Sequence, residues 1–342
     1  MIATIWFCLI AIMIAGYVIL DGFDLGAGMI HLFVARNQEE RQRVLGSIGP
    51  VWDGNEVWLL AAGGTLYFAF PALYAAAFSG FYLALMLVLW LLILRGVAIE
   101  LRGHIQSPLW RPFWDLVFGG ASTLLALLYG VALGNVVRGV PLDSNGYFFI
   151  PLWTDLVPSS NAGIVDWYTL LIGLASLSVL AVHGASWVAY KTSGDLQTRS
   201  RSFGAKIWWA VVLLTAVITF VSYQLQPNIA KEFSERPWGV IFPVLALAGL
   251  LGMRLASARG RDLGAFLCSS LYLTGMLTSV TFGVYPYVLP SNVGPGTALT
   301  VTNAAAAEYG LWIGLWWWIP GMLLAGVYSF FVYRHFAGKV EG

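Results

Sequence analysis

The composition of this chain of 342 residues excludes a water-soluble globular enzyme, because 59% of the residues are hydrophobic and only 10% are charged. Soluble domains carry charge on roughly a quarter of their residues. The 18 Lys and Arg nearly balance the 17 Asp and Glu, so the chain lacks the basic field that nucleic-acid binding requires.

Several apolar stretches are long enough, or nearly long enough, to cross a bilayer, which takes about 20 residues in a helix. In chain order, we predict helices over residues 2–34, 54–70, 72–101, 113–137, 164–190, 205–225, 240–257, 263–284 and 304–336. The sequence therefore predicts an all-α integral membrane protein with about nine transmembrane helices, in which residues 1–342 form a single polytopic domain. We expect two four-helix bundles plus one peripheral helix.

The basic residues indicate how the chain is oriented, because Lys and Arg collect in short cytoplasmic loops. All but three of the 18 Lys and Arg lie near the ends of the first, third, fifth, seventh and ninth predicted helices. The exceptions are Arg138, Lys231 and Arg236. This alternation favours an odd number of spans, with the N-terminus outside and the C-terminus in the cytoplasm.

The first predicted helix carries two acids, Asp21 and Asp24, whose spacing places both on one face. An ionisable group in the membrane costs at least a few kcal/mol and is usually paired or functional. The best partner in the chain is Arg95, in the third predicted helix. Two interpretations stay open: the acids only pair with Arg95 to hold helices together, or one of them remains free to carry protons.

The second predicted helix opens with the segment WDGNEVW, residues 52–58. Asp53 and Glu56 have the spacing of a capping box, so we predict that they cap this helix. A cap at the cytoplasmic edge is also where a proton pathway would begin. Trp58 is typical of an anchor at the membrane interface.

The third predicted helix ends with Arg95 and Glu100, which are five residues apart and therefore point to different faces. Each needs a partner elsewhere. For Arg95 the candidates are Asp21 and Asp24, and for Glu100 they are another subunit or water.

Metal and haem ligands are scarce. The four histidines, His31, His104, His183 and His335, form no paired motif, and Cys8 and Cys268 lie in apolar stretches without a CxxC. We therefore predict that this chain binds no metal and ligates no haem. Motifs for nucleotide hydrolysis and for hydrolases are absent from the sequence.

Three parts of the chain form a set of motifs: GYVILDGFDLGAG (residues 16–28), IGPVWDGNEVWL with FPALYAAAFSGFYLALMLVL (residues 48–59 and 70–89), and LRGVAIELR (residues 94–102). Together they resemble one known family, the second subunit of cytochrome bd-type quinol oxidases. The motifs cover roughly the first third of the chain, and the rest agrees in hydropathy and helix number. The resemblance implies a terminal oxidase of a bacterial inner membrane, which oxidises quinol and reduces oxygen to water.

The resemblance also implies a division of labour between subunits. The active site and haems b558, b595 and d belong to a partner, subunit I, which also binds the quinol. Subunit II is a haem-free accessory subunit. Membrane lipids, a small single-helix subunit and a structural quinone are further expected partners. By their place in the motifs, Asp53 and Glu100 match positions linked to proton uptake, Trp58 matches the tryptophan near an oxygen tunnel, and Arg95 matches a basic position of the family.

With Asp21 and Asp24, the residues Asp53 and Glu100 make up the predicted proton pathway. Two alternatives of other classes are open. An ion-coupled secondary transporter also uses acids near the midplane and glycine-rich helices, although it should show two related halves. A purely structural scaffold, whose acids only form pairs, is the weaker form of the oxidase interpretation.

Overall fold

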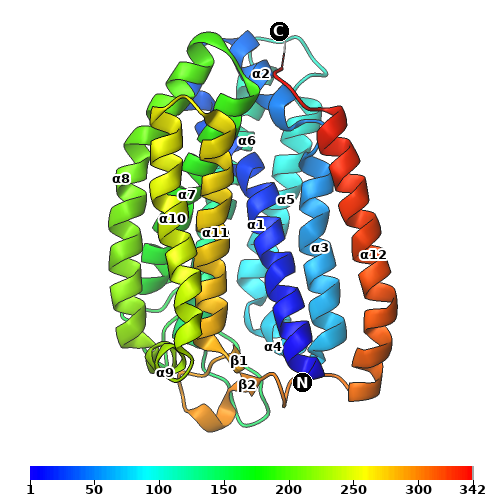
Figure 1. The fold of residues 1–342 in the computed structure, drawn as a ribbon, viewed down its shortest axis with the longest axis vertical. Coiled ribbons are helices and arrows are strands. Elements are labelled where there is room, and N and C mark those ends of the chain that lie inside the picture. Colours follow the sequence, from blue (N-terminus) through cyan, green and yellow to red (C-terminus); the bar gives the residue numbers. More distant parts are fainter. Residues whose placement is uncertain (341–342) are drawn as a thin grey trace.

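The computed structural model describes residues 1–340, most of which are helical (Figure 1). The α-helices are α1 (Ile2–Val34), α2 (Gln38–Ile48), α3 (Trp52–Ala69), α4 (Pro71–Gly80), α5 (Tyr82–Leu101), α6 (Trp110–Arg138), α7 (Trp167–Lys191), α8 (Gly194–Leu225), α9 (Pro227–Glu235), α10 (Ile241–Ala258), α11 (Asp262–Val284) and α12 (Glu308–His335). This part of the chain also contains two short 3-10 helices, Pro237–Val240 and Pro295–Thr297. Its strands are an antiparallel pair, β1 (Tyr287–Leu289) and β2 (Leu299–Thr300).

The N-terminus and the end of α12 lie at opposite ends of the molecule (Figure 1). We call the end that holds α2 and the end of α12 the C-terminal face, and it also carries the turns from α7 to α8 and from α10 to α11. The opposite end, the N-terminal face, holds α4, α9, β1 and β2. Ends on opposite faces require an odd number of crossings.

Eight helices of the described chain are long and apolar enough to cross a membrane, namely α1, α5, α6, α7, α8, α10, α11 and α12. The further crossing is α3, which packs beside α1 (Figure 1). Its 18 residues span about 27 Å, close to the bilayer core of about 30 Å. Its acids, Asp53 and Glu56, lower its mean hydropathy. The predicted all-α membrane fold of about nine spans is confirmed.

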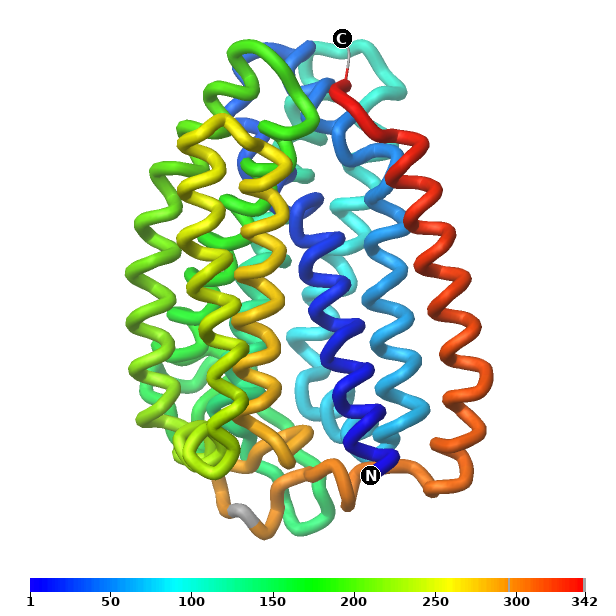
Figure 2. Tube along the Cα trace, in the orientation of Figure 1, coloured from blue at the N-terminus to red at the C-terminus, as the bar shows by residue number. Residues whose placement is uncertain are grey.

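The spans form the two predicted bundles, which lie side by side (Figure 2). Helices α1, α3, α5 and α6 make the first bundle, and α7, α8, α10 and α11 make the second. Helix α12 lies outside the first bundle as the peripheral helix. Contacts of α1 and α6 with α7, and of α1 with α11, join the bundles.

The bundles meet at two glycines, Gly26 of α1 and Gly184 of α7. A Cβ atom on Gly26 would lie 2.1 Å from the carbonyl oxygen of Leu180, and one on Gly184 would lie 2.2 Å from the backbone of Gly26. These distances are below any real Cβ contact, so the two backbones touch. Small residues permit this approach in membrane helices.

The predicted single helix over residues 72–101 is wrong, because the chain breaks at Phe81 into α4 and α5. The cause lies in the loop that follows α6. The ring of Phe148 fills the space beside Gly80, where a Cβ would lie 2.3 Å from it. The Ile150 amide also donates to the Gly80 carbonyl at 3.4 Å.

Two other boundaries differ from the prediction for local reasons. The helix predicted over residues 164–190 begins at Trp167, because the Asp166 side chain accepts two backbone amides of the first turn. The helix predicted over residues 205–225 begins earlier, at Gly194, because its first turns are polar and extend out of the apolar stretch. Hydropathy alone does not detect such turns.

Candidate functional site

A guanidinium and a carboxylate lie inside the first bundle without any exposure to solvent. Arg95 of α5 donates from Nη1 to Oδ2 of Asp21 on α1 at 2.9 Å, and the same nitrogen lies 2.7 Å from Oδ1 in an ion pair. Its Nη2 atom contacts Oε2 of Glu56 on α3 at 3.2 Å. One arginine therefore connects three helices through two acids, a geometry that offsets part of the cost of burying its charge.

Asp24, one turn further along α1, is buried but does not contact Arg95. Its Oδ2 atom accepts from Nδ2 of Asn55 at 2.8 Å, while its Oδ1 atom has no hydrogen-bond partner among residues 1–340. The expected pairing of Arg95 with both aspartates is thus present only for Asp21, and Glu56 takes the second place. We call Asp21, Asp24, Asn55, Glu56 and Arg95 the acid cluster.

One tyrosine of α12 contacts the acid cluster, and two other tyrosines form a separate pair between α1 and α6. The Tyr333 hydroxyl donates to Oδ1 of Asn55 at 2.7 Å. Below Asp21, the hydroxyl of Tyr17 donates to that of Tyr129 at 2.8 Å. Sequence reasoning missed Asn55 and these tyrosines, because uncharged polar side chains are common in membrane helices and carry no signal of their own.

The predicted capping box of Asp53 and Glu56 is wrong. Helix α3 begins at Trp52, and its N-cap is Val51, which makes no side-chain cap. Asp53 therefore lies within the first turn, where the helix dipole favours an acid, and it is exposed. The Glu56 carboxylate does not accept a backbone amide at the start of the helix, because it binds Arg95.

Glu100 and Trp58 lie apart from the buried ion pair. Glu100 is exposed on the last turn of α5, and within the described chain its carboxylate forms no ion pair. Trp58 of α3 is partly exposed and packs on α1, where a Cβ on Gly16 would lie 3.3 Å from its ring. The structure therefore brings together Asp21, Asp24 and Arg95, but not Glu100.

Another buried carboxylate, which the sequence analysis did not single out, lies near the C-terminal face. Asp115 of α6 accepts from Nε of Arg102 at 2.5 Å and from Nη1 of Arg41 at 3.0 Å. The buried His31 ring approaches it at 3.7 Å. With two arginines donating to it, the Asp115 carboxylate is paired, and the contacts tie α2 and α6 to the end of α5, beside His31 of α1.

The comparisons with known proteins match nearly the whole chain and point to one family. Residues 2–336 match the family model described as cytochrome bd terminal oxidase subunit II. The chain belongs to this family.

Relatives of this subunit II occur in several bacteria. The probable cytochrome oxidase subunit 2 of Haemophilus influenzae is 32% identical, over 98% of this chain and 94% of its own length. The cytochrome bd-I ubiquinol oxidase subunit 2 of Escherichia coli is 30% identical, over 98% of this chain and 94% of its own. The cytochrome bd ubiquinol oxidase subunit 2 of Bacillus subtilis is 29% identical, over 96% and 95%.

The fold has a solved counterpart. The structure of bd oxidase from Geobacillus thermodenitrificans contains a chain that is 18% identical, with a TM-score of 0.75 over 98% of both chains. The resemblance drawn from the motifs is thereby confirmed. The chain is a multi-pass membrane subunit of a bd-type quinol oxidase, and the alternative of a secondary transporter has no support.

The two buried histidines of this subunit II make hydrogen bonds within the chain. His183 uses both ring nitrogens, contacting the Ser269 hydroxyl at 2.7 Å and the Ile19 carbonyl at 2.9 Å. Nδ1 of His31 lies 2.6 Å from the Gly28 carbonyl oxygen. Among residues 1–340, no group of three or more His, Cys, Asp or Glu is placed to hold a metal ion. In this family the haems belong to the partner subunit.

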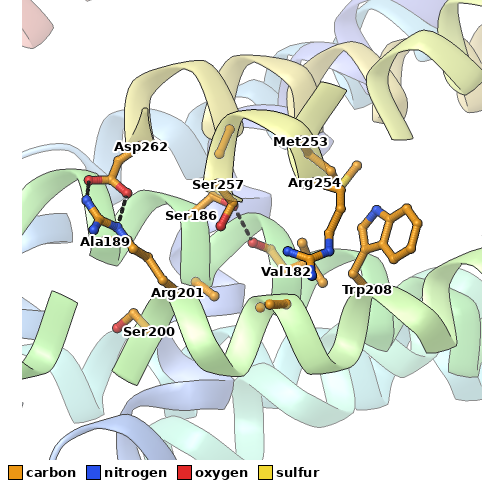
Figure 3. A pocket seen from close by; sticks show the side chains of 14 residues that line it. Val182, Ser186, Ala189, Ser200, Arg201, Trp208, Met253, Arg254, Ser257 and Asp262 are labelled. Carbon is orange, nitrogen blue, oxygen red and sulfur yellow. Dashed lines mark hydrogen bonds and ion pairs between the residues drawn. The ribbon is translucent and has the colours of Figure 1, made fainter. Parts of the chain in front are cut away.

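The second bundle contains a small cavity between α7, α8, α10 and α11 (Figure 3). Arg254 is directed into it, and Arg201 pairs with Asp262 at its edge at 2.6 Å. Its volume of about 20 Å³ suits a single water molecule rather than an organic ligand. The buried acids of the first bundle are therefore the stronger candidate for function.

Proposed function

We propose that this subunit II of a cytochrome bd oxidase takes up protons from the cytoplasm and passes them toward the oxygen-reducing centre of subunit I. One observation carries the proposal. Asp21 and Glu56 share Arg95, whereas the buried Asp24 contacts no cation among residues 1–340. An unpaired buried charge is costly, so a carboxyl group in this position exchanges protons rather than staying ionised.

The distribution of basic residues supports the orientation that this function needs. Lys and Arg are concentrated in the loops of the C-terminal face, which in the proposed topology is cytoplasmic. The N-terminus then lies outside, across the bacterial inner membrane. Asp53, exposed at the start of α3, is on the cytoplasmic side and collects protons.

The stoichiometry of the reaction explains the demand for protons. Oxidation of two quinols releases four electrons, and reduction of one oxygen molecule to two waters consumes those four electrons and four protons. When bound in subunit I, haems b558, b595 and d supply the electron transfer and the oxygen chemistry. This chain holds and moves protons at carboxyl oxygens.

The proposed route follows α3 inward from the C-terminal face. Asp53 and Glu56 are one turn apart, and the Glu56 side chain is 23% exposed, whereas Asp21 and Arg95 are fully buried. Glu56 therefore links solvent to the interior. Arg95 holds Asp21 in place, and Asp24 provides the carboxyl oxygen that lacks a partner.

The remaining predicted residues have separate proposed roles. Glu100, exposed on α5, faces subunit I or water and provides a second proton uptake point. Trp58, partly exposed between α1 and α3, lines the apolar access route for oxygen. A structural quinone, a small single-helix subunit and lipids complete the proposed assembly, and the exposed apolar side chains of α12 offer surface for them.

Oxygen consumption by the purified complex of both subunits, with excess quinol, tests the proposal. Asp24→Asn should lower turnover about tenfold or more while the haem spectrum of the complex is unchanged, since a proton-transfer group contributes about 10²–10⁴-fold at most. Asp143→Asn, an exposed loop acid on the other face, is the matched control and should behave as wild type. Wild-type turnover of Asp24→Asn at every pH would leave the acid cluster a structural role only.

A further inference from the structure

The peripheral helix α12 contributes one side chain to the acid cluster. The Tyr333 hydroxyl donates to Oδ1 of Asn55 at 2.7 Å. The Nδ2 atom of Asn55 donates to Asp24 Oδ2 at 2.8 Å and to the Leu20 carbonyl at 3.3 Å. Three helices, α12, α3 and α1, are thus joined by one chain of hydrogen bonds that ends on the acid without a cationic partner.

We propose that Tyr333 is a positioning residue, which fixes the Asn55 amide so that its N–H group faces Asp24. The proposal rests on the proton role of the acid cluster. An amide has a donor end and an acceptor end, and a carboxylate or carbonyl only accepts. Asp24 and Leu20 therefore require the NH₂ end, and Oδ1 of Asn55 needs a donor. Tyr333 supplies that donor from the opposite side.

Without the Tyr333 hydroxyl, the acceptor end of Asn55 is buried and unpaired, which is the costly state of a polar group. The amide can then rotate, and rotation places Oδ1 against the Asp24 carboxyl group. Asp24 loses its one hydrogen-bond donor within the described chain. Tyr333 thus controls the surroundings of Asp24 without touching it.

The position of Tyr333 depends on how α12 is held. The fully buried residues of α12, Leu311 and Gly314, lie near its start, far from Tyr333. At the C-terminal face, Val332 and Tyr333 are only partly buried against the core, with the Tyr333 ring 6.3 Å from that of Trp187.

The C-terminal tail, residues 336–340, adds direct hydrogen bonds to this packing through two lysines. Lys191, at the end of α7, donates from Nζ to the Phe336 carbonyl that caps α12, at 2.7 Å. Lys339 donates from Nζ to the Thr192 carbonyl that caps α7, also at 2.7 Å. The Val340 amide donates to the Lys191 carbonyl at 2.8 Å.

Lys191 of α7 therefore caps the C-terminus of α12, and Lys339, in the tail that follows α12, caps the C-terminus of α7. A cation at this end satisfies free carbonyls and interacts favourably with the helix dipole. The reciprocal arrangement fixes the end of α12 to α7, and it helps to hold Tyr333, three residues before the cap, over Asn55. We call these two contacts the lysine lock.

The test uses the purified complex with subunit I and records infrared difference spectra between its reduced and oxidised forms. The carboxyl band that disappears in Asp24→Asn is assigned to Asp24. Tyr333→Phe, which removes one hydroxyl, should shift this band, lower turnover about two- to tenfold and displace the pH profile by up to about one unit. Tyr328→Phe, on the exposed side of α12, is the matched control and should leave all three unchanged.

The lysine lock is tested by Lys339→Met, with Lys206→Met, an exposed lysine of α8, as its control. Lys339→Met should shift the Asp24 band in the same direction as Tyr333→Phe, although it lies outside the acid cluster. This surface variant also keeps the proposal testable if Tyr333→Phe does not assemble. An unshifted band in Lys339→Met would show that the tail does not help to hold Tyr333 over Asn55.

The outcomes separate this proposal from the proton role. If Asp24→Asn alters turnover and the spectrum while Tyr333→Phe matches wild type in both, the positioning role is refuted and the proton role stands. If Asp24→Asn itself leaves turnover and the spectrum unchanged, both are refuted. A loss of turnover in Tyr333→Phe with an unshifted band and pH profile would indicate a structural role and would also refute positioning.

Discussion

Arg95 of α5 and Asp21 of α1 form a direct ion pair at 2.7 Å, and neither side chain is exposed to solvent. Glu56 is the second partner of Arg95 and is partly exposed. Arg95 therefore ties α1, α3 and α5 together, and it holds the carboxylates of Asp21 and Glu56 in place beside Asp24.

Removal of Arg95 should be more harmful than removal of the whole pair. Arg95→Met leaves Asp21 buried without its cation, which costs about 3–5 kcal/mol for a buried pair. The double variant Arg95→Met with Asp21→Asn should recover part of this loss. Thermal unfolding and haem content of the purified complex measure it. Equal destabilisation by the single and double variants would contradict the idea that an uncompensated charge is the cause.

Gly26 should not tolerate a side chain. Gly26→Ala places a methyl group 2.1 Å from the Leu180 carbonyl, so α1 and α7 must move apart, and the yield of folded protein should fall sharply. Gly120→Ala in α6 is the control, since its Cβ meets no atom within 4 Å, and alanine there should stabilise the helix by about 0.5–1 kcal/mol. Comparable yields of the two variants would refute direct backbone contact.

Acid should weaken the ion pair between Glu40 of α2 and Arg199 of α8. Partial burial alone would raise the pKa of Glu40, but the Arg36 amide and the Arg199 guanidinium donate to its carboxylate and lower the pKa below its usual value. A lowered folded-state pKa means that the stabilisation is complete above the unfolded value of about 4.3 and is lost as the pH falls through the folded value.

The unfolding temperatures of wild type and Glu40→Gln measure this link. Wild type should unfold at a higher temperature at pH 7, and the difference should shrink on acidification below about pH 4. Glu39→Gln, at a more exposed neighbouring position, should show a smaller effect, as surface pairs do. A difference that is the same at both pH values would exclude ionised Glu40 as its source.

The sequence predicted the fold well because the signals it used are local. Hydropathy and the alternation of Lys and Arg depend only on composition along the chain, and they gave the spans and the bundles. The break at Phe81 could not be predicted in this way, because its cause, Phe148 and Ile150, lies in a loop far along the chain.

The candidate site was predictable only where a charge interrupts an apolar stretch. Asp21 and Arg95 were visible for that reason. Asp115 was not, because it lies close to the start of its predicted helix and resembles a terminal charge. The cap at Asp53 was wrong because a capping box is a local pattern, whereas Glu56 has a stronger partner, Arg95, on another helix.

The structure predicts which acids act together. Glu56 and Asp24 belong to one cluster, so the effects of Glu56→Gln and Asp24→Asn on turnover should not multiply in the double variant, as is usual for residues of one network. Glu100 is exposed on α5 and makes no contact with the cluster, so Glu100→Gln combined with Asp24→Asn should multiply. Oxygen consumption of the single and double variants, at equal haem content, gives both coupling values. Independent effects for Glu56 and Asp24 would mean that protons reach Asp24 by a route that bypasses α3, and strong coupling to Glu100 would place that route along the exposed face of α5.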